Sequence, residues 1–323
     1  MRLAKKTRYL FYKYLFKIKD IYRKKKLNKT RSVKELEAIV NYLESEVSRI
    51  SSLVRYIATP RINDLPFIKR TNDSFDFQWK NIENNGYNLK NNNFLKQATN
   101  NVCRFTSLSC GWFKGKNILD VGCGSGRYSW ALSKLGANVL SIDQSGYGIE
   151  KTKKACAEFK NHRAIQVDLL KPFQIDEKFD LVWCFGVLHH TGDAYGTFKK
   201  IASLVRPNGY LFVMIYGEPR PGVIEDYLTL NEYMYWRKKT YNMSLDERLN
   251  CVREVMKKRK FRICGEENID GYFDAISPSI NDLYSFEEIK QWFMLEDFCE
   301  IIRTVDARNH YIIAKKSTKA RRV

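Results

Sequence analysis

The sequence predicts an α/β protein built on a doubly wound sheet of seven strands, with an N-terminal helical extension of coiled-coil type. Three observations support this fold class. Short apolar runs of strand character alternate with amphipathic stretches of helix character between residues 117 and 314. A glycine-rich turn follows the first of these strands, and an acidic residue ends the second. A regular apolar repeat precedes the whole region, over residues 32–59.

Positive charge is concentrated at the N-terminus. The chain has 323 residues and a formal net charge of +20, and residues 1–31 hold thirteen Lys and Arg residues against a single acid. As a helix, residues 9–22 would present an aromatic and apolar stripe opposite lysines, which suits the surface of an anionic membrane. The same residues could bind RNA, and a solvated basic tail is the third interpretation. We expect a cytoplasmic protein that is peripheral on the inner membrane face, with nucleic acid as the less favoured partner.

The eight cysteines indicate a reducing compartment. They form no C-x-x-C pair and no zinc-ligand spacing, and several lie within apolar, strand-like runs. We therefore expect buried free thiols and no metal site. The chain also lacks an apolar run of the ~18–20 residues that a transmembrane helix needs, and it shows no convincing signal peptide.

Residues 32–59 contain the most regular pattern of the chain. Ser32 and Glu35 form a capping box, and apolar residues then recur over 33–57 at alternating spacings of three and four. This repeat is typical of a left-handed coiled coil, and its choice of Val, Leu and Ile favours a parallel homodimer through 33–57. Further apolar residues beside the stripe suit packing in a bundle or against the rest of the chain equally well.

The glycine turn lies between a strand at 118–121 and an amphipathic helix. Its sequence, Gly-Cys-Gly-Ser-Gly at 122–126, suits a tight turn that lets a ligand approach the main chain. The next strand ends in Asp143, 21 positions after Gly122, where a carboxylate can accept both hydroxyls of a ribose. The dinucleotide pattern G-x-G-x-x-G requires a third glycine at the position of Arg127, so this pattern is absent.

Asp120, on the strand, followed by G-x-G-x-G resembles motif I of class I S-adenosylmethionine-dependent methyltransferases. The resemblance implies a Rossmann-like fold and S-adenosylmethionine as the cofactor. The alternative is a purely structural glycine turn. The cofactor-binding residues that the resemblance implies are Asp120, Gly122, Gly124, Gly126, Asp143, Gln144, Asp168, Leu169 and Phe185.

The third strand adds a second acid to this pattern. A helix over 146–159 leads to a strand at 164–167, which ends in Asp168. The step from Asp143 to Asp168 matches one helix plus one strand. In the resembled family an acid at this place bonds the adenine amino group, and the main chain of the next residue, here Leu169, contacts the ring edge.

The exit of the fourth strand bears on the acceptor. It reads Val-Leu-His-His at 187–190, and the Asn/Asp-Pro-Pro-Tyr element of enzymes that methylate exocyclic amines is absent there. The segment resembles that of small-molecule and lipid methyltransferases, including the quinone-biosynthesis group. This favours transfer to oxygen or carbon of a non-polymeric acceptor. His189 and His190 are candidate general bases, and the alternative is that they pack at the strand exit without titrating.

The rest of the domain continues the alternation, apart from residues 222–278, which we expect to form an inserted helical cap. The expected elements are a helix at 94–109, a helix at 194–205, a turn at 206–209, a strand at 210–215, a helix at 286–293 with Ser285 as its N-cap, and strands at 300–305 and 311–314.

Two further segments resemble a group of bacterial methyltransferases linked with surface-sugar or lipid biosynthesis. The first, Ser-Phe-x-x-Gln-Trp ending at Trp79, lies in a connection over 60–93 that we expect to be partly irregular. The second, Phe-Asp-x-x-Ser-Pro, contains Asp274. Trp79 and Asp274 are therefore candidate acceptor-binding residues. The alternatives are a hydrophobic plug for Trp79 and a local cap for Asp274.

These observations lead to one functional hypothesis with two alternatives. We expect a methyltransferase that acts on oxygen or carbon of a small-molecule, sugar or lipid-linked acceptor. The alternatives are an RNA methyltransferase guided by the basic tail and an inactive coiled-coil membrane adaptor.

The expected domains are a basic tail at 1–31, a coiled-coil-like helix at 32–59, a connection at 60–93, a methyltransferase domain at 94–316 that includes the cap, and a second basic tail at 317–323.

Overall fold

The computed structural model describes residues 65–82, 92–258 and 269–318. The chain divides into two compact units, Met1–Thr59 and Pro60–Val323, and the described residues all belong to the second. The predicted basic tail and the predicted coiled coil, including its dimer contact, therefore lie outside the described residues. Within the part of the chain that the structure describes, no helix is long and apolar enough to cross a membrane.

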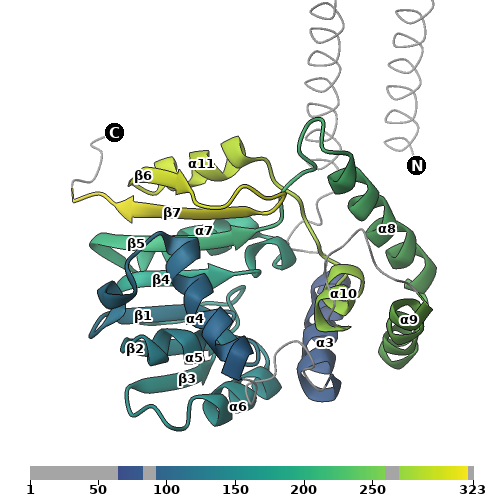
Figure 1. Ribbon diagram of the computed structural model, residues 1–323, viewed down its shortest axis with the longest axis horizontal. Coiled ribbons are helices and arrows are strands. Elements are labelled where there is room, and N and C mark those ends of the chain that lie inside the picture. Colours follow the sequence, from purple (N-terminus) through teal and green to yellow (C-terminus); the bar gives the residue numbers. More distant parts are fainter. Residues whose placement is uncertain (1–64, 83–91, 259–268, 319–323) are drawn as a thin grey trace, which may run out of the picture. The chain divides into compact units, whose positions relative to one another are not determined.

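A single mixed sheet of seven strands forms the centre of this unit (Figure 1). The strand order is β3-β2-β1-β4-β5-β7-β6, and β7 runs antiparallel to both of its neighbours. The predicted seven-stranded, Rossmann-like sheet is thus confirmed. The strands are β1 (Asn117–Val121), β2 (Asn138–Asp143), β3 (His162–Gln166), β4 (Phe179–Phe185), β5 (Val205–Ile215), β6 (Phe298–Arg303) and β7 (His310–Lys316).

Helices cover both faces of the sheet because side chains alternate along each strand. One face carries α4 (Asn92–Thr106), the short η1 (Cys110–Phe113) and α5 (Arg127–Lys134) around a core that includes Trp183 and Phe212. The opposite face carries α7 (Ala194–Ser203) and α11 (Phe286–Leu295). The helix α6 (Gly146–Ala155) packs beside β2 and β3. The central strands β1 and β4 are almost entirely buried on both faces, as expected for parallel strands that are covered on each side.

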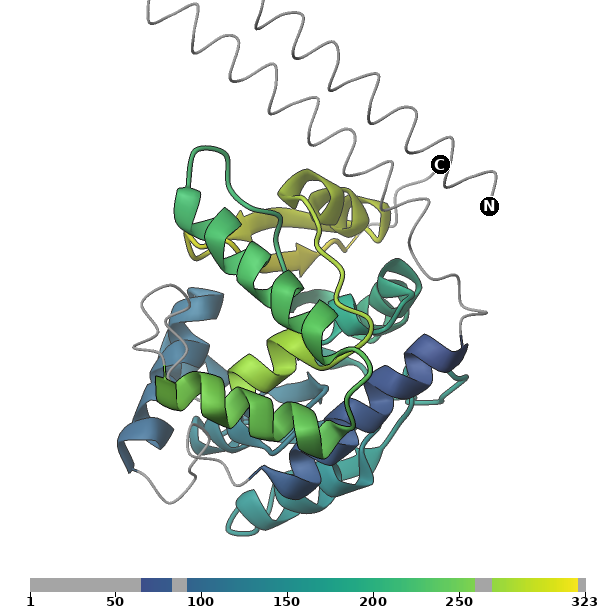
Figure 2. The ribbon, with the colours of Figure 1, turned by 90° about the vertical axis from the view of Figure 1, so that its right-hand side faces the viewer.

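The described part of the predicted cap is helical (Figure 2). Its helices share an apolar core of their own. The cap consists of α8 (Ile224–Thr240), α9 (Leu245–Lys258) and α10 (Ile269–Ile276). Buried side chains of these three helices, such as Tyr233, Val252 and Phe273, pack together and against Ile82. The cap lies beside the carboxyl ends of β4 and β5, where ligands bind in open sheets of this kind.

The structure corrects the expected connection over 60–93. A helix of 17 residues, α3 (Leu65–Asn81), occupies much of it, and Trp79 lies on this helix rather than in a loop. The helix buries polar side chains, notably those of Thr71, Ser74 and Gln78. The sequence therefore lacks the apolar stripe from which a helix would be predicted, and tertiary packing decides its conformation.

Two smaller expectations also change. The fifth strand begins at Val205 instead of 210, and the expected turn forms an irregularity within it, where Asn208 has a φ of 62° and the register with β4 shifts. Cys103 and Cys110 form a disulfide, so they are not the free thiols that we expected. Cys299 is free but exposed, whereas Cys123, Cys156 and Cys184 are buried free thiols as predicted.

Candidate active site

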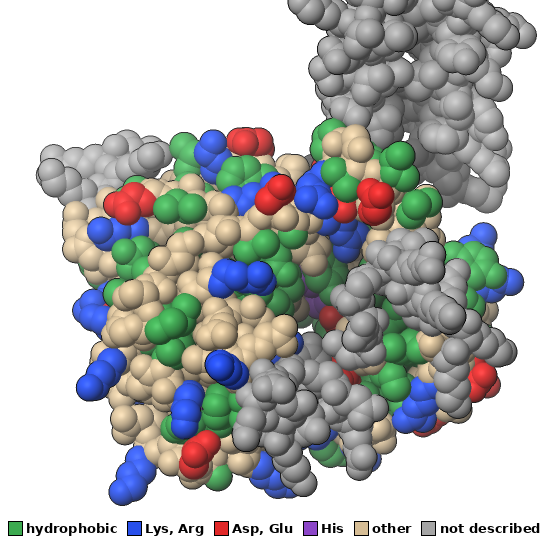
Figure 3. Space-filling model, viewed as in Figure 1, with side chains coloured by type: hydrophobic (Ala, Val, Ile, Leu, Met, Phe, Trp, Pro, Cys, Tyr) green, Lys and Arg blue, Asp and Glu red, His purple; other side chains and the backbone are tan. Residues whose placement is uncertain are grey.

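A cavity opens at the carboxyl ends of the parallel strands, bounded also by α3 and α10 (Figure 3). Its empty volume is about 1150 Å³ when the space of its open mouth is included. The predicted site residues that line it are Trp79, Gly122, Gly124, Asp143, Gln144, Asp168, Leu169, Phe185, His190 and Asp274. Most of the site residues predicted from separate segments of the sequence therefore line one cavity in the folded protein.

Asp143 anchors the glycine turn. Its Oδ2 accepts a hydrogen bond from the Gly124 amide at 2.9 Å, and its Oδ1 accepts one from the Ser145 amide at 2.8 Å. Burial raises the pKa of Asp143 to about 6, although these amide hydrogen bonds act in the opposite direction. The carboxylate is thus mainly ionised at neutral pH, and each oxygen retains a lone pair for a further hydroxyl donor.

The backbone of the turn fits a ligand that approaches the main chain closely. Gly122 and Gly124 have φ values of +69° and +54°, which side chains other than glycine rarely adopt. A Cβ atom at Gly122 would stand 2.2 Å from Val187 Cγ2, and one at Gly124 would stand 2.6 Å from the Trp79 ring. Together with the ionised Asp143, this cradle fits the nucleoside of S-adenosylmethionine.

The other predicted cofactor residues lie along the same wall. Asp168 Oδ1 accepts the Leu170 amide at 3.0 Å, and its Oδ2 lies 3.2 Å from Lys171 Nζ. The Leu169 carbonyl accepts Lys200 Nζ at 2.7 Å. Asp168 therefore follows β3 as a fixed, partly exposed carboxylate, in the position that the spacing predicted.

Three predicted site residues do not line the cavity. Asp120 is buried behind β1, where its Oδ2 accepts the Ser129 hydroxyl at 2.6 Å, and burial raises its pKa to about 7. Gly126 is the N-cap of α5, and a Cβ there would meet the α6 backbone at Thr152. Asp120 and Gly126 thus contact α5 and α6 next to the glycine turn, outside the cavity lining.

His189 is the third of these residues. Its Nδ1 accepts the Tyr216 amide at 3.3 Å, and its ring stacks on the Tyr216 ring with centroids 3.7 Å apart. Its side chain is fully buried, and burial lowers its pKa well below the ordinary value. These contacts position Tyr216, and of the two candidate general bases it is His190 that lines the cavity.

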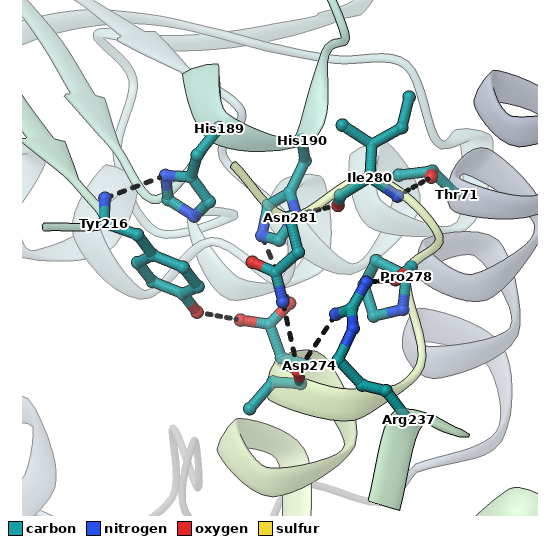
Figure 4. A network of polar contacts seen from close by, with 10 residues as sticks. Thr71, His189, His190, Tyr216, Arg237, Asp274, Pro278, Ile280 and Asn281 are labelled. Carbon is teal, nitrogen blue, oxygen red and sulfur yellow. Dashed lines mark hydrogen bonds and ion pairs between the residues drawn. The ribbon is translucent and has the colours of Figure 1, made fainter. Parts of the chain in front are cut away.

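His190 is the histidine that reaches the cavity (Figure 4). Its Nδ1 lies 2.9 Å from the Ile280 carbonyl. Because a carbonyl only accepts, Nδ1 carries the hydrogen, and Nε2 presents a lone pair. Burial lowers the pKa of His190 to about 4, so the ring is neutral at physiological pH. A neutral imidazole with a free lone pair in a cavity has the form of a general base.

Asp274 faces that lone pair. Its Oδ1 lies 3.7 Å from His190 Nε2, and its Oδ2 accepts the Tyr216 hydroxyl at 3.1 Å. Burial raises the pKa of Asp274 to about 7. Neither His190 Nε2 nor Asp274 Oδ1 has a hydrogen-bond partner within the described segments. Two such atoms in a cavity wall are suited to a polar group of a ligand.

Sequence reasoning missed two residues of this network, Tyr216 and Arg237. Tyr216 comes directly after β5, so the rule that ligands bind at the carboxyl ends of strands could have indicated it. Arg237 lies in the last turn of α8 and donates to backbone carbonyls, and no motif marks it. Trp79 packs on Gly124 beside Asp143, at the end of the cavity that fits the cofactor rather than beside Asp274.

Comparison with known proteins identifies a methyltransferase domain in this chain. Residues 119–213 match the family described as methyltransferase domain. The ubiquinone biosynthesis O-methyltransferase of Coxiella burnetii is 35% identical over 102 residues, which cover 31% of this chain and 43% of that protein. The enzyme of the same name from Bradyrhizobium diazoefficiens is 36% identical over 109 residues, which cover 33% and 42%. The chain thus spans less than half the length of these curated relatives.

Solved structures resemble the chain more distantly. The complex of DhpI with SAH has 13% sequence identity and a TM-score of 0.48, and the match covers 78% of this chain and 98% of that one.

The family match shows a methyltransferase domain over residues 119–213, and the fold and the glycine turn with Asp143 are those expected of the class I S-adenosylmethionine-dependent type. S-adenosylmethionine is the cofactor of this class. The narrower resemblance to the surface-sugar group is not confirmed by these relatives.

Proposed function

We propose that this protein transfers the methyl group of S-adenosylmethionine to an oxygen or carbon atom of a small-molecule acceptor. When bound, the cofactor supplies an electrophilic methyl group. The observation that carries the proposal is a single cavity whose wall combines the Asp143 glycine turn with the unpartnered His190 Nε2 atom. The names of the relatives, which are O-methyltransferases, support oxygen as the receiving atom.

The chain's own residues would act as follows. Asp143, Asp168 and the backbone at Gly122 hold the cofactor, and the aromatic walls at Phe75 and Phe185 exclude water. His190 Nε2 accepts the proton of the acceptor hydroxyl, because Nδ1 is committed to the Ile280 carbonyl. The imidazolium that results faces Asp274, whose carboxylate form would stabilise it.

The acceptor itself is proposed to be a small molecule, a sugar or a lipid-linked compound. The composition of residues 1–31 supports a cytoplasmic location at the inner membrane face, where a lipid-linked acceptor would be presented. The apolar repeat over 33–57 supports a homodimer, which would place two such tails side by side.

Incubation with methyl-labelled S-adenosylmethionine and a fractionated lysate of the source organism tests this function. We expect label in the small-molecule, saccharide or lipid fraction, and none from an Asp143→Ala control. Label in RNA would overturn the proposed acceptor class in favour of an RNA methyltransferase. A protein that binds no cofactor and labels no fraction would favour the inactive adaptor.

A further inference from the structure

The segment 275–281, which we call the strap, links the two halves of the proposed catalytic pair. Asp274 directly precedes it in the chain, and the Ile280 carbonyl within it accepts the hydrogen bond of His190 Nδ1. The Ile280 amide donates to Thr71 Oγ1 on α3 at 2.9 Å. The position of the strap therefore determines both the tautomer of His190 and the location of Asp274.

Arg237 holds this strap from α8. Its Nη2 donates to the Pro278 carbonyl at 2.7 Å (Figure 4). Its Nη1 donates to the Ala275 carbonyl at 3.1 Å, and its Nη2 also donates to the Ser279 carbonyl at 3.1 Å. Carbonyls at the end of a helix such as α10 lack partners within the helix, and a forked guanidinium can satisfy several of them. One side chain thus holds the strap at its first residue and at its middle.

The electrostatics of Arg237 are unusual for a residue that only supports the backbone. Burial lowers its pKa to about 10, so it remains charged at neutral pH. Its hydrogen bonds within the described residues all go to carbonyls, and a buried charge without a direct carboxylate partner is costly. The groups that favour the charge of Arg237 are Tyr216, Asp274 and Asp282, and Arg237 in turn disfavours a proton on His190.

We infer that Arg237 is a positioning residue for methyl transfer: through the strap carbonyls it keeps His190 in the Nδ1–H tautomer with Nε2 facing Asp274. This inference rests on the proposed function, because it gives the strap a role only if His190 acts as the base. Under this inference, the cap not only contributes to the cavity wall but also determines the tautomer of His190, the proposed base.

Nitrogen-15 NMR of the histidine rings in the full-length protein tests the inference without cofactor or acceptor. The chain has only four histidines, and a His190→Gln variant assigns the signal. We expect a single Nδ1–H tautomer in the unaltered protein. In Arg237→Gln the strap loses three hydrogen bonds, so the tautomer ratio should change at least about fivefold, the equivalent of one such bond.

The pH titration of the same signal gives a second readout. Among the described residues, the charged or titratable groups with a contact or charge interaction with the His190 ring are His189 beside it, Tyr216 after β5, Arg237 on α8 and Asp274 on α10. Arg237→Gln removes the one cation among them, so the ring should gain its proton at a higher pH than in the unaltered protein. Arg237→Lys retains the charge but not the fork, so it should alter the tautomer ratio more than the titration.

Arg248→Gln is the matched control. Arg248, on α9, donates to the Ser277 carbonyl of the strap at 2.8 Å, and its hydrogen bonds to the strap do not include the carbonyls that Arg237 binds. We expect the His190 signal of the Arg248→Gln variant to be the same as in the unaltered protein.

A folded Arg237→Gln protein with an unaltered His190 tautomer and titration would overturn the inference, and so would an equal change in Arg248→Gln. If Arg237→Gln does not fold, Arg237→Lys decides by the same criterion. Failure of cofactor binding in calorimetry would instead overturn the proposed function alone.

Discussion

His190 Nε2 and Asp274 Oδ1 face each other across 3.7 Å, although one belongs to the short helix η2 (Leu188–His190) after β4 and the other to the cap helix α10. The pair therefore exists only when the cap is docked on the sheet. Because burial opposes a charge on either residue, the neutral imidazole retains its lone pair until an acceptor proton arrives.

The two adjacent histidines should respond differently to substitution. His190→Gln removes the proposed base, and we expect the rate of methyl transfer to fall by about 10²-fold or more while S-adenosylhomocysteine binds as before. His189→Gln disrupts a fully buried ring that stacks on Tyr216, so its main effect should be a lower melting temperature. Label transfer, calorimetry and thermal melts separate these effects. Equal losses of rate at equal stability would contradict the assignment.

The pKa of Asp274 predicts a pH-dependent stability. Burial raises this pKa from 3.8 to about 7, so the unfolded chain loses the proton at lower pH than the folded protein does. The stability linked to this proton is fully present below about pH 4 and is lost as the pH rises through about 7.

Asp274→Asn removes this titration. Between pH 4 and pH 8, we expect the free energy of unfolding of the unaltered protein to fall by roughly 2–4 kcal/mol relative to that of the variant. Urea unfolding of both proteins at the two pH values measures the difference. A difference that does not change with pH would show that Asp274 has an ordinary pKa in the folded protein.

Gly124 and Trp79 predict a steric effect at the cofactor end. A methyl group at Gly124 would lie 2.6 Å from the Trp79 ring, at a φ of +54°. We expect Gly124→Ala to lose about 1 kcal/mol or more of stability from the backbone alone and to bind S-adenosylhomocysteine more weakly. Gly111→Ala is the control, because a Cβ there meets nothing within 4 Å.

A second substitution checks the cause of that effect. If the clash with Trp79 contributes, the double variant Gly124→Ala, Trp79→Leu should be less destabilised than the sum of the two single variants. Simple additivity in thermal melts would attribute the whole effect to the backbone conformation.

Most of the sheet could be predicted because its central parallel strands are buried on both sides and appear in the sequence as short apolar runs. The end of β2 at Asp143 and the glycine turn at 122–126 are determined by local sequence, so this part of the site could be predicted as well. The helix α3 could not be predicted, since Thr71 and Gln78 are polar residues that only the folded protein buries.

The acceptor end of the site depends on contacts between distant segments. The sequence marks Asp274 only through a family resemblance, and it marks Arg237 not at all, because the role of Arg237 comes from carbonyl groups that any residue carries. Asp120 shows the opposite error. It stands in the motif, but the pleat of β1 turns its side chain away from the cavity and toward Ser129.

Calorimetric titration with S-adenosylhomocysteine tests the central claim, that this cavity is a methyltransferase cofactor site, most directly. We expect a dissociation constant in the range of about 1 µM to 1 mM for the unaltered protein. Asp143→Ala removes the carboxylate that holds the Gly124 and Ser145 amides and should weaken binding at least about tenfold. Asp176→Ala, at an exposed position, should not change it. Equal affinity in the unaltered protein and Asp143→Ala, or no binding by either, would contradict the claim.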